Sequence, residues 1–216
     1  MAHTNKRGDV VGVNGNMVSV AFQSGAVQNE VAYICTGESR LKSEVIRVRG
    51  NRADLQVFEN TGGVKVGDTV EFTGELLSVA LGPGLLTQIY DGLQNPLPRL
   101  AEEAGFFLPR GQYLYPLDTE AKWEFTPTAA VDDTVSAGDA LGTVPEGIFE
   151  HRIMVPFDWD GTWRITEIAS AGEYTIEDTI AKATDGSHEC EISMTQNWPV
   201  KVPLSCYREK KLPTEP

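Results

Sequence analysis

The sequence is poor in the residues that carry covalent and metal chemistry. It has 3 cysteines and 3 histidines in 216 residues, and Cys35, Cys190 and Cys206 stand at unrelated spacings. An odd number of cysteines at such spacings provides no disulfide framework and is typical of a reducing compartment. His188 and Cys190 are two residues apart, but a zinc site needs three or four ligands and no second pair lies nearby. We therefore predict no metal site and interpret the cysteines as structural or incidental.

Long apolar runs are also missing. The N-terminus "MAHTNKRGDVVGV" has no apolar stretch of signal-peptide length, and nowhere do about 18 apolar residues follow one another as a membrane-spanning helix requires. We expect the chain to be made and kept in the cytoplasm, with any membrane association through partners. At 216 residues and 41% hydrophobic composition, it is long enough for one large or two small domains with real cores.

Basic residues are scarce after the first third of the chain. The formal net charge is −13, from 18 Lys and Arg against 31 Asp and Glu. Residues 1–70 are nearly balanced, with 8 basic and 7 acidic side chains, whereas residues 116–188 hold 4 basic and 15 acidic ones. Such a surface repels phosphate backbones, so we predict no nucleic-acid binding through it. Two interpretations fit equally well: attraction to a basic protein partner, or an acidic surface that keeps the protein soluble.

Phosphate-binding motifs are absent. The dipeptide Gly-Lys occurs nowhere, so the chain has no G-x-x-x-x-G-K-[ST] loop to hold a triphosphate. Gly82 and Gly84 match the first two glycines of G-x-G-x-x-G, but Thr87 takes the third position and no parallel βαβ pattern surrounds it. The sequence therefore predicts no cofactor-binding residue in the chain.

Carboxylate pairs are the remaining candidates for acid–base chemistry. Asp132 and Asp133 are adjacent, and Asp158 and Asp160 flank a tryptophan next to Gly161. In an acidic segment such positions are typical of turns. Cysteine–histidine catalysis would need a positioned base, which no pattern here supplies. We therefore predict no catalytic residue. Four tryptophans are interpreted as core or interface residues with bonded indole N–H groups: Trp123, Trp159, Trp163 and Trp198.

The first part of the chain has the pattern of an all-β domain. Between residues 8 and 72, five or six β-rich runs follow one another with no helical run between them, and Asn14-Gly15 and Gly50-Asn51 are typical of tight hairpin turns. Alternation is imperfect in "SEVIRVR", where we assign Ile46 and Val48 to one face. Because closure leaves no long edge exposed, we predict a small closed β-barrel over residues 1–73.

Residues 74–115 have a different pattern. Apolar residues from Leu85 to Leu93 recur at helical spacing after the glycines, and Asn95-Pro96 ends the run, which predicts a loop and a short helix. Residues 116–188 return to β character, with a Gly and Asp turn pattern that resembles the barrel-sandwich of lipoyl and biotinyl carrier domains. The hairpin "FEHRIMVP" lacks the lysine that such carriers modify. Residues 189–216 begin as a strand and continue into a Pro- and Lys-containing tail.

Four segments, taken in order, carry a more specific resemblance. They are "GNMVSVAFQSGAVQNEVAYI", the block "LKSEVIRVRGNRADLQVFENTGGVKVGDTVEFTGELLSVALGPGLLTQIYDGLQNPL", "FLPRG" and "MTQNWPVKVP". Together they span nearly the whole chain and resemble the catalytic A subunit of the V-type and A-type rotary ATPases. The resemblance implies a mainly β fold with a partial α/β segment between the barrel and the second β-rich domain.

The same resemblance implies how the chain divides into segments and what each segment does. It implies an N-terminal barrel at 1–73, a piece of the nucleotide-binding domain at 74–115, an acidic bulge at 116–188 and a return strand at 189–216. The barrel would contact B subunits in an alternating ring, and the bulge would meet peripheral-stalk subunits. The full subunit would turn over MgATP and couple it to H⁺ or Na⁺ transport on the cytoplasmic face of a membrane. Its phosphate loop and catalytic glutamate would lie beyond residue 216, so an N-terminal fragment would be inactive alone.

Two alternatives stay open. A biotin or lipoate carrier would need a modified lysine at the hairpin tip. A non-catalytic scaffold or binding module that reuses the ring-ATPase barrel would need neither a phosphate loop nor a transported ion.

Overall fold

The computed structural model describes residues 6–23, 25–86, 88–105 and 110–207, and these are mainly β. The chain divides into two compact units. We call residues 1–78 with 97–114 the barrel unit, and residues 79–96 with 115–216 the sandwich unit. None of the helical segments in the described ranges has the length and apolar character needed to cross a membrane.

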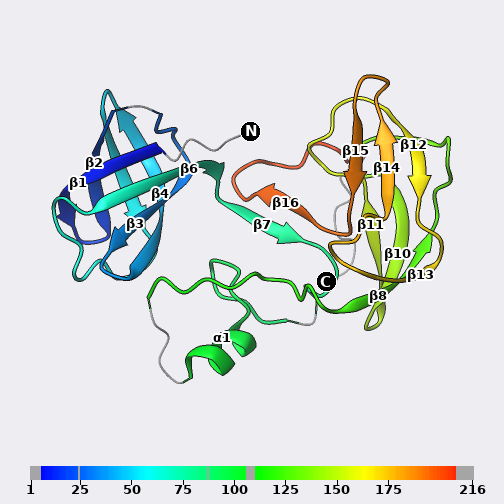
Figure 1. The fold of residues 1–216 in the computed structure, drawn as a ribbon, viewed down its shortest axis with the longest axis horizontal. Helices are drawn as coiled ribbons and strands as arrows, with labels where there is room; N and C mark the ends of the chain where they lie inside the picture. Colours follow the sequence, from blue (N-terminus) through cyan, green and yellow to red (C-terminus); the bar gives the residue numbers. More distant parts are fainter. Residues whose placement is uncertain (1–5, 24, 87, 106–109, 208–216) are drawn as a thin grey trace, which may run out of the picture. The chain divides into compact units, whose positions relative to one another are not determined.

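The barrel unit contains a closed six-stranded barrel, drawn from blue to cyan in Figure 1. Its strands pair antiparallel in the order β1-β2-β5-β4-β3-β6, and β6 returns to β1. They are β1 (Lys6–Asn14), β2 (Met17–Phe22), β3 (Glu30–Thr36), β4 (Ser39–Arg49), β5 (Arg52–Val57) and β6 (Thr69–Leu76). The predicted small closed barrel is confirmed, and its interior is filled by aliphatic side chains and two phenylalanines from all six strands.

Three hairpins of the barrel turn through two-residue loops that begin with glycine. Gly15, Gly37 and Gly50 have φ angles of 60°, 56° and 57°, a region that side chains other than Gly, Asn and Asp rarely enter. Such turns match the twist of the strands they join. The turns predicted at Gly15 and Gly50 are confirmed.

A β-bulge explains the imperfect alternation in β4. The pairing of β4 with β5 shifts between Val45 and Arg47, which leaves Ile46 as the extra residue. Val45 is fully buried and Val48 packs against the barrel core, whereas Ile46 does not belong to that core. The prediction that Ile46 and Val48 share one face is therefore wrong, because the bulge puts Val45, and not Ile46, on the inner face with Val48.

A short stretch, residues 110–114, packs on the outside of the barrel, and we call it the strap. The backbone N–H of Gly111 donates to the carboxylate of Glu59 at 3.1 Å, and the hydroxyl of Tyr113 donates to the same carboxylate. Gly111 has a φ of 74°, and a Cβ there would lie 2.8 Å from the carbonyl oxygen of Arg40. Only glycine therefore lets the strap approach the barrel this closely.

The one helix among the described residues is α1 (Leu97–Ala104), which begins where the predicted helix should have ended. The helix predicted from Leu85 to Leu93 is wrong, because no described residue of that stretch is helical. Leu86 and Ile89 are 57% and 67% exposed, so the apolar spacing does not face a core. Side chains also hold the backbone in another conformation, since the Asp91 carboxylate accepts the N–H of Leu93 at 2.8 Å.

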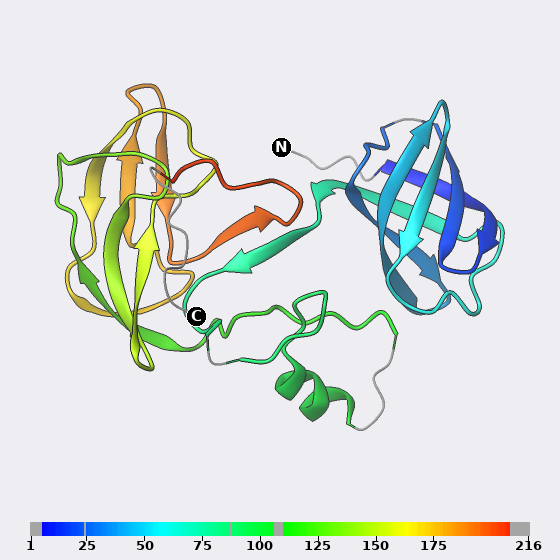
Figure 2. The ribbon, with the colours of Figure 1, turned by 180° about the vertical axis from the view of Figure 1, so that it is seen from behind.

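The sandwich unit is built from two four-stranded sheets, seen from behind in Figure 2. Their orders are β11-β10-β8-β13 and β15-β14-β12-β9, and a separate pair joins β7 (Ser78–Leu81) to β16 (Gln196–Pro199). The first sheet contains β8 (Lys122–Pro127), β10 (Ala140–Glu146), β11 (Phe149–Met154) and β13 (Gly172–Thr175). The second contains β9 (Thr134–Val135), β12 (Trp163–Ile168), β14 (Ala181–Thr184) and β15 (Glu189–Ile192).

Both sheets contribute to one buried cluster. Phe125 and Leu141 from the first sheet and Ile165 and Ala183 from the second are fully buried in it. The predicted second β-rich domain of barrel-sandwich type is therefore confirmed as a separate core.

Candidate functional site

The last residue of β10, Glu146, places a buried carboxylate against the loop that carries Gly82 and Gly84. Its side chain is 1% exposed. One carboxylate oxygen accepts the backbone N–H of Gly84 at 2.8 Å and that of Leu86 at 2.9 Å. The other oxygen lies 2.6 Å from Nδ1 of His151. We call residues 82–86 the glycine loop.

The β10–β11 hairpin brings Glu146 and His151 together. Glu146 pairs with Phe149 across the turn, and Val144 pairs with His151 two positions further along. Gly147 opens the turn with a φ of 63°. Glu146 and His151 are therefore diagonal neighbours on one face of the hairpin, within reach of each other.

Packing explains the glycines of the loop. A Cβ on Gly82 would lie 2.8 Å from the side chain of Thr195, and Gly84 has a φ of 101°. The loop therefore needs glycine for close approach and for its backbone angle. The N–H groups of Gly84 and Leu86 converge on one oxygen, as at an anion-binding site, and the anion is a carboxylate of the same chain.

Tyr90 lies beyond the glycine loop in the same unit. Its hydroxyl donates to the carbonyl oxygen of Pro116 at 3.0 Å. Burial raises the pKa of Tyr90, and the negative charge of Glu146 raises it further. The phenol is therefore held protonated, as a donor.

The outer face of the second sheet carries a row of charges that we call the acidic sheet face. Glu167, Lys182 and Glu191 stand side by side on β12, β14 and β15, and Glu189 lies two residues before Glu191. Nζ of Lys182 is 3.0 Å from Glu167 and 4.0 Å from Glu191. The hydrogen bond to Glu167 raises the pKa of Lys182. Three carboxylates around one ammonium leave this face with net negative charge.

Comparison with known proteins matches both units. Residues 10–74 match the family model described as ATP synthase alpha/beta family, beta-barrel domain, and residues 114–201 match that of the ATP synthase alpha/beta subunit barrel-sandwich domain. The V-type ATP synthase alpha chain of Treponema denticola is 57% identical over 213 residues, which cover 98% of this chain and 36% of the relative. The chain belongs to the V-type ATP synthase alpha-chain family. The resemblance seen in the sequence is thereby confirmed.

Other members of the alpha-chain family match along the same length. The V-type ATP synthase alpha chain 1 of Treponema pallidum is 55% identical over 214 residues, 99% of this chain and 36% of the relative. The alpha chain of Borreliella burgdorferi strain ZS7 is 53% identical over 213 residues, 98% of this chain and 37% of the relative. The chain thus spans just over a third of the length of the curated relatives it matches.

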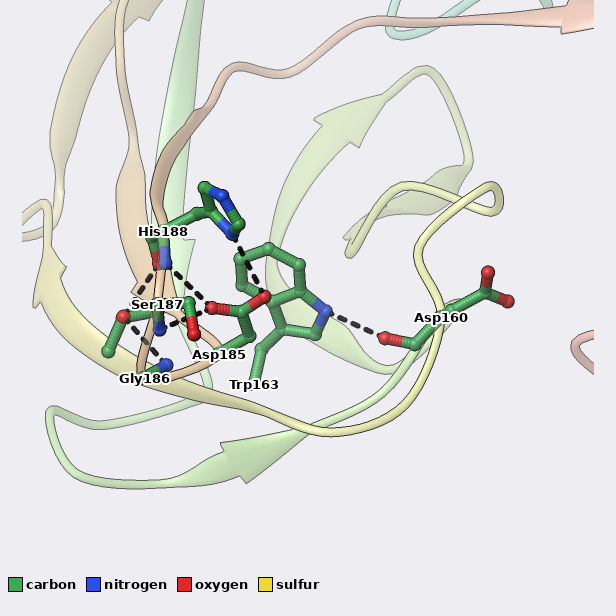
Figure 3. A network of polar contacts seen from close by, with 7 residues as sticks. Asp160, Trp163, Asp185, Gly186, Ser187 and His188 are labelled. Carbon is green, nitrogen blue, oxygen red and sulfur yellow. Dashed lines mark hydrogen bonds and ion pairs between the residues drawn. The ribbon is translucent and has the colours of Figure 1, made fainter.

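His188 and Cys190 lie in different surroundings in this member of the alpha-chain family. Figure 3 shows His188 in the turn before β15, where its backbone N–H donates to the Asp185 carboxylate at 2.7 Å. Cys190 packs against the buried cluster of the sandwich unit. Within the described part of the chain, no group of three or more His, Cys, Asp or Glu could hold a metal ion.

The two carboxylate pairs singled out in the sequence lie at turns or loops of the sandwich unit. The exposed Asp132 forms an ion pair with Arg164 at 2.8 Å, and Asp133 accepts the N–H of Ala130 at 2.7 Å. The side chains of Asp158 and Asp160 are exposed. That the chain has no catalytic, cofactor-binding or metal-binding residue of its own remains a prediction.

Two of the four indole groups follow the predicted bonding. Trp163 donates to the carbonyl oxygen of Asp160 at 3.1 Å, as Figure 3 shows, and Trp198 donates to that of Val202 at 2.8 Å. Trp159 packs against Trp163 with ring centroids 4.0 Å apart. The buried N–H of Trp123 has no acceptor among the described residues, so for this residue the prediction is wrong.

Sequence reasoning missed Glu146 and His151 as members of one cluster. The signal in the sequence was a glutamate at the end of a mainly apolar strand, directly before a hairpin glycine. The strap was missed as well. Within "FLPRG", residues 107–109 lie outside the described residues, whereas the Arg110 guanidinium donates to the carbonyl oxygens of Asn60 and Gly62.

Proposed function

We propose that this chain is the N-terminal region of a catalytic A subunit, the alpha chain of a V-type ATPase that couples ATP turnover to H⁺ or Na⁺ transport. The observation that carries this proposal is 57% identity to a V-type ATP synthase alpha chain along 98% of the chain. In this proposal the barrel spans residues 1–73, residues 74–115 and 189–216 belong with the nucleotide-binding domain, and the bulge spans 116–188. MgATP or ADP would bind the longer subunit, and the 216-residue chain alone would be inactive.

We propose that the barrel serves ring assembly through contacts with B subunits. A closed barrel leaves no edge strand for non-specific pairing and suits a rigid element that stays in place while catalytic domains open and close. The strap supports this role, because Glu59 binds both Gly111 and Tyr113 and so ties the chain that leaves α1 back onto the barrel.

We propose that the acidic bulge meets peripheral-stalk subunits through the acidic sheet face, to which the adjoining residues Glu189 and Glu191 of β15 also contribute. The side chains of Glu167 and Glu191 are 66% and 67% exposed, so their charge is available to a basic partner. Charge complementarity speeds association and selects partners. The complex would lie on the cytoplasmic face of a membrane, attached through its other subunits, and the chain would bind no nucleic acid.

A chimera tests the subunit assignment. The segment of the Treponema denticola alpha chain that matches this chain is replaced by this chain, and the hybrid is assembled with the other subunits of that enzyme. We expect ring assembly and MgATP hydrolysis within a few-fold of the parent. A hybrid that folds but does not enter the ring would contradict the proposal and favour a scaffold of separate function. The control replaces only the segment that matches residues 10–74.

A stalk-binding assay tests the docking surface in the same hybrid. Changing Glu167, Glu189 and Glu191 to glutamine should weaken stalk binding about tenfold at low salt and flatten its salt dependence. The matched control removes three exposed carboxylates of the barrel unit, Asp9, Glu38 and Glu75, and should leave stalk binding unchanged. Equal effects of the two triple variants would mean that net charge, and not this face, controls binding.

A further inference from the structure

The glycine loop makes contacts that the proposed subunit function does not use. Glu146 is 2% exposed, and its carboxylate accepts hydrogen bonds from two loop N–H groups while lying 2.6 Å from the His151 ring. These contacts join residues 62 and 60 positions apart in the sequence. The carboxylate is therefore the group that ties the loop after β7 to the hairpin of β10 and β11.

We propose that Glu146 is an internal anion that latches the glycine loop onto the sandwich unit, and that a free small carboxylate can take its place when the side chain is removed. The inference rests on the contacts of Glu146 and not on the proposed subunit function. It holds whether or not the chain works in an ATPase.

The geometry favours an ionised carboxylate over a neutral side chain. Gly84 and Leu86 both donate to one oxygen, so that oxygen accepts two hydrogen bonds, and His151 meets the other. Hydrogen bonds to an ionised acceptor are roughly twice as strong as neutral ones. A buried N–H left without an acceptor is costly, so removal of the carboxylate opens the loop or draws another anion into the space.

The latch also restrains the residues that come after the loop. Gln94 donates to the carbonyl oxygen of Ala80 and accepts its N–H, both at 2.8 Å, so residues 80–94 form a closed excursion from β7. A loose glycine loop leaves this excursion held at its base and by the hydrogen bond from Tyr90 to Pro116. We therefore expect the effect of losing Glu146 to spread from Gly84 to Tyr90.

The test is native-state hydrogen exchange followed by chemical rescue on the 216-residue chain. In Glu146→Ala, the amides of Gly84 and Leu86 should exchange about tenfold faster or more, because each loses its charged acceptor. Added sodium formate should restore much of this protection, whereas sodium chloride at the same ionic strength should not. Unchanged exchange in a folded Glu146→Ala protein would overturn the proposal. So would a loss of protection that formate does not reverse.

Glu30 offers a matched control in the barrel unit. It is 1% exposed, and its two carboxylate oxygens accept the N–H groups of Val27 and Gly74. Glu30→Ala should speed exchange at Val27 and Gly74 and leave Gly84 and Leu86 as in the wild type. If Glu30→Ala speeds exchange at the glycine loop as much as Glu146→Ala does, the effect is general destabilisation and the internal-anion proposal is wrong.

A second variant keeps the test decisive if Glu146→Ala does not fold. Glu146→Gln preserves shape and one acceptor oxygen but removes the charge. The amide protons of Gly84 and Leu86 should shift upfield and exchange a few-fold faster, without any response to formate, since the space stays filled. Amide shifts and exchange equal to those of the wild type would overturn the internal-anion proposal.

Discussion

Carboxylates that bind backbone N–H groups recur at the residue scale. Glu30, Glu59 and Glu146 each accept backbone N–H groups from a segment distant in sequence: Gly74, Gly111 and the glycine loop. Buried or half-buried N–H groups need acceptors, and a carboxylate can serve two or three at once. These three residues therefore join backbone segments that are distant in sequence, in both units.

Tyr113 shows what one such contact contributes. Its hydroxyl accepts the backbone N–H of Lys42 at 2.7 Å and donates to Glu59, and burial, with the Glu59 hydrogen bond, raises its pKa. Tyr113→Phe leaves both partners without this hydroxyl, and we expect the free energy of unfolding to fall by about 1–3 kcal/mol. Urea denaturation measures the loss.

The matched control for this variant is Tyr115→Phe, at a tyrosine that is 46% exposed. It should change the free energy of unfolding by less than about 0.5 kcal/mol. Equal effects of the two variants would mean that the Tyr113 hydroxyl contributes nothing specific.

Asp185 provides a pH dependence with a defined sign. The backbone N–H groups of His188 and Ser187 lower the pKa of its carboxyl from 3.8, so the folded state binds fewer protons than the unfolded state in acid. Its contribution to stability is present above pH 3.8 and is lost as the pH falls through the lowered folded-state pKa. Asp185→Asn should be less stable than the wild type at neutral pH, and the difference should shrink to nothing in acid.

Thermal unfolding across a pH series measures this difference. The control is the exposed Asp158, and Asp158→Asn should change the free energy of unfolding at neutral pH by less than about 0.5 kcal/mol. A difference for Asp185→Asn that stays constant down to the most acidic samples would contradict the argument.

At the element scale, single positions set how strands meet. β10 pairs antiparallel with β8 at Gly142. A Cβ on Gly142 would lie 2.3 Å from the ring of the buried Phe125 and 2.6 Å from the carbonyl oxygen of Thr126. Gly142→Ala should therefore lower the free energy of unfolding by about 1–3 kcal/mol, because the strands or the ring must move. Urea denaturation followed by tryptophan fluorescence checks this.

Gly92 provides the control for that substitution. A Cβ there meets no atom within 4 Å, and its φ angle is not positive, so Gly92→Ala should be neutral or slightly stabilising. If Gly142→Ala is as well tolerated as Gly92→Ala, the close approach of β8 and β10 does not limit stability.

The elements also show where local patterns stop being informative. Glycine-led turns and alternating strands are local properties, and the barrel follows from them. The apolar spacing from Leu85 to Leu93 is a local pattern too, but the Asp91 carboxylate accepts the backbone N–H of Leu93, which a helix would direct to a carbonyl oxygen four residues earlier. The Ile46 bulge likewise depends on the register with β5, which no single strand contains.

At the scale of the whole molecule, the residues that the structure describes build two cores that share no residue. One is the barrel core, which includes Leu55, and the other is the sandwich core, which includes Leu141. Both side chains are fully buried. Damage to one core should therefore stay within its unit.

Leucine-to-alanine substitutions test this separation. Leu55→Ala should destabilise the barrel unit by about 2–5 kcal/mol and leave slow amide exchange around Leu141 unchanged, and Leu141→Ala should do the reverse. Hydrogen exchange with mass spectrometry reads both units in one experiment. Global loss of protection from either single variant would mean that the two units unfold as one.

The sequence by itself determined the β class, the hairpin turns at Gly15 and Gly50 and the family, because each depends on residues close together in the chain or on the order of whole segments. The tertiary structure decided the position of α1, the inner face of β4 and the partner of the glycine loop. The reason is physical. A buried carboxylate such as Glu146 takes its acceptor role only when folding brings a loop 60 residues away within hydrogen-bonding distance.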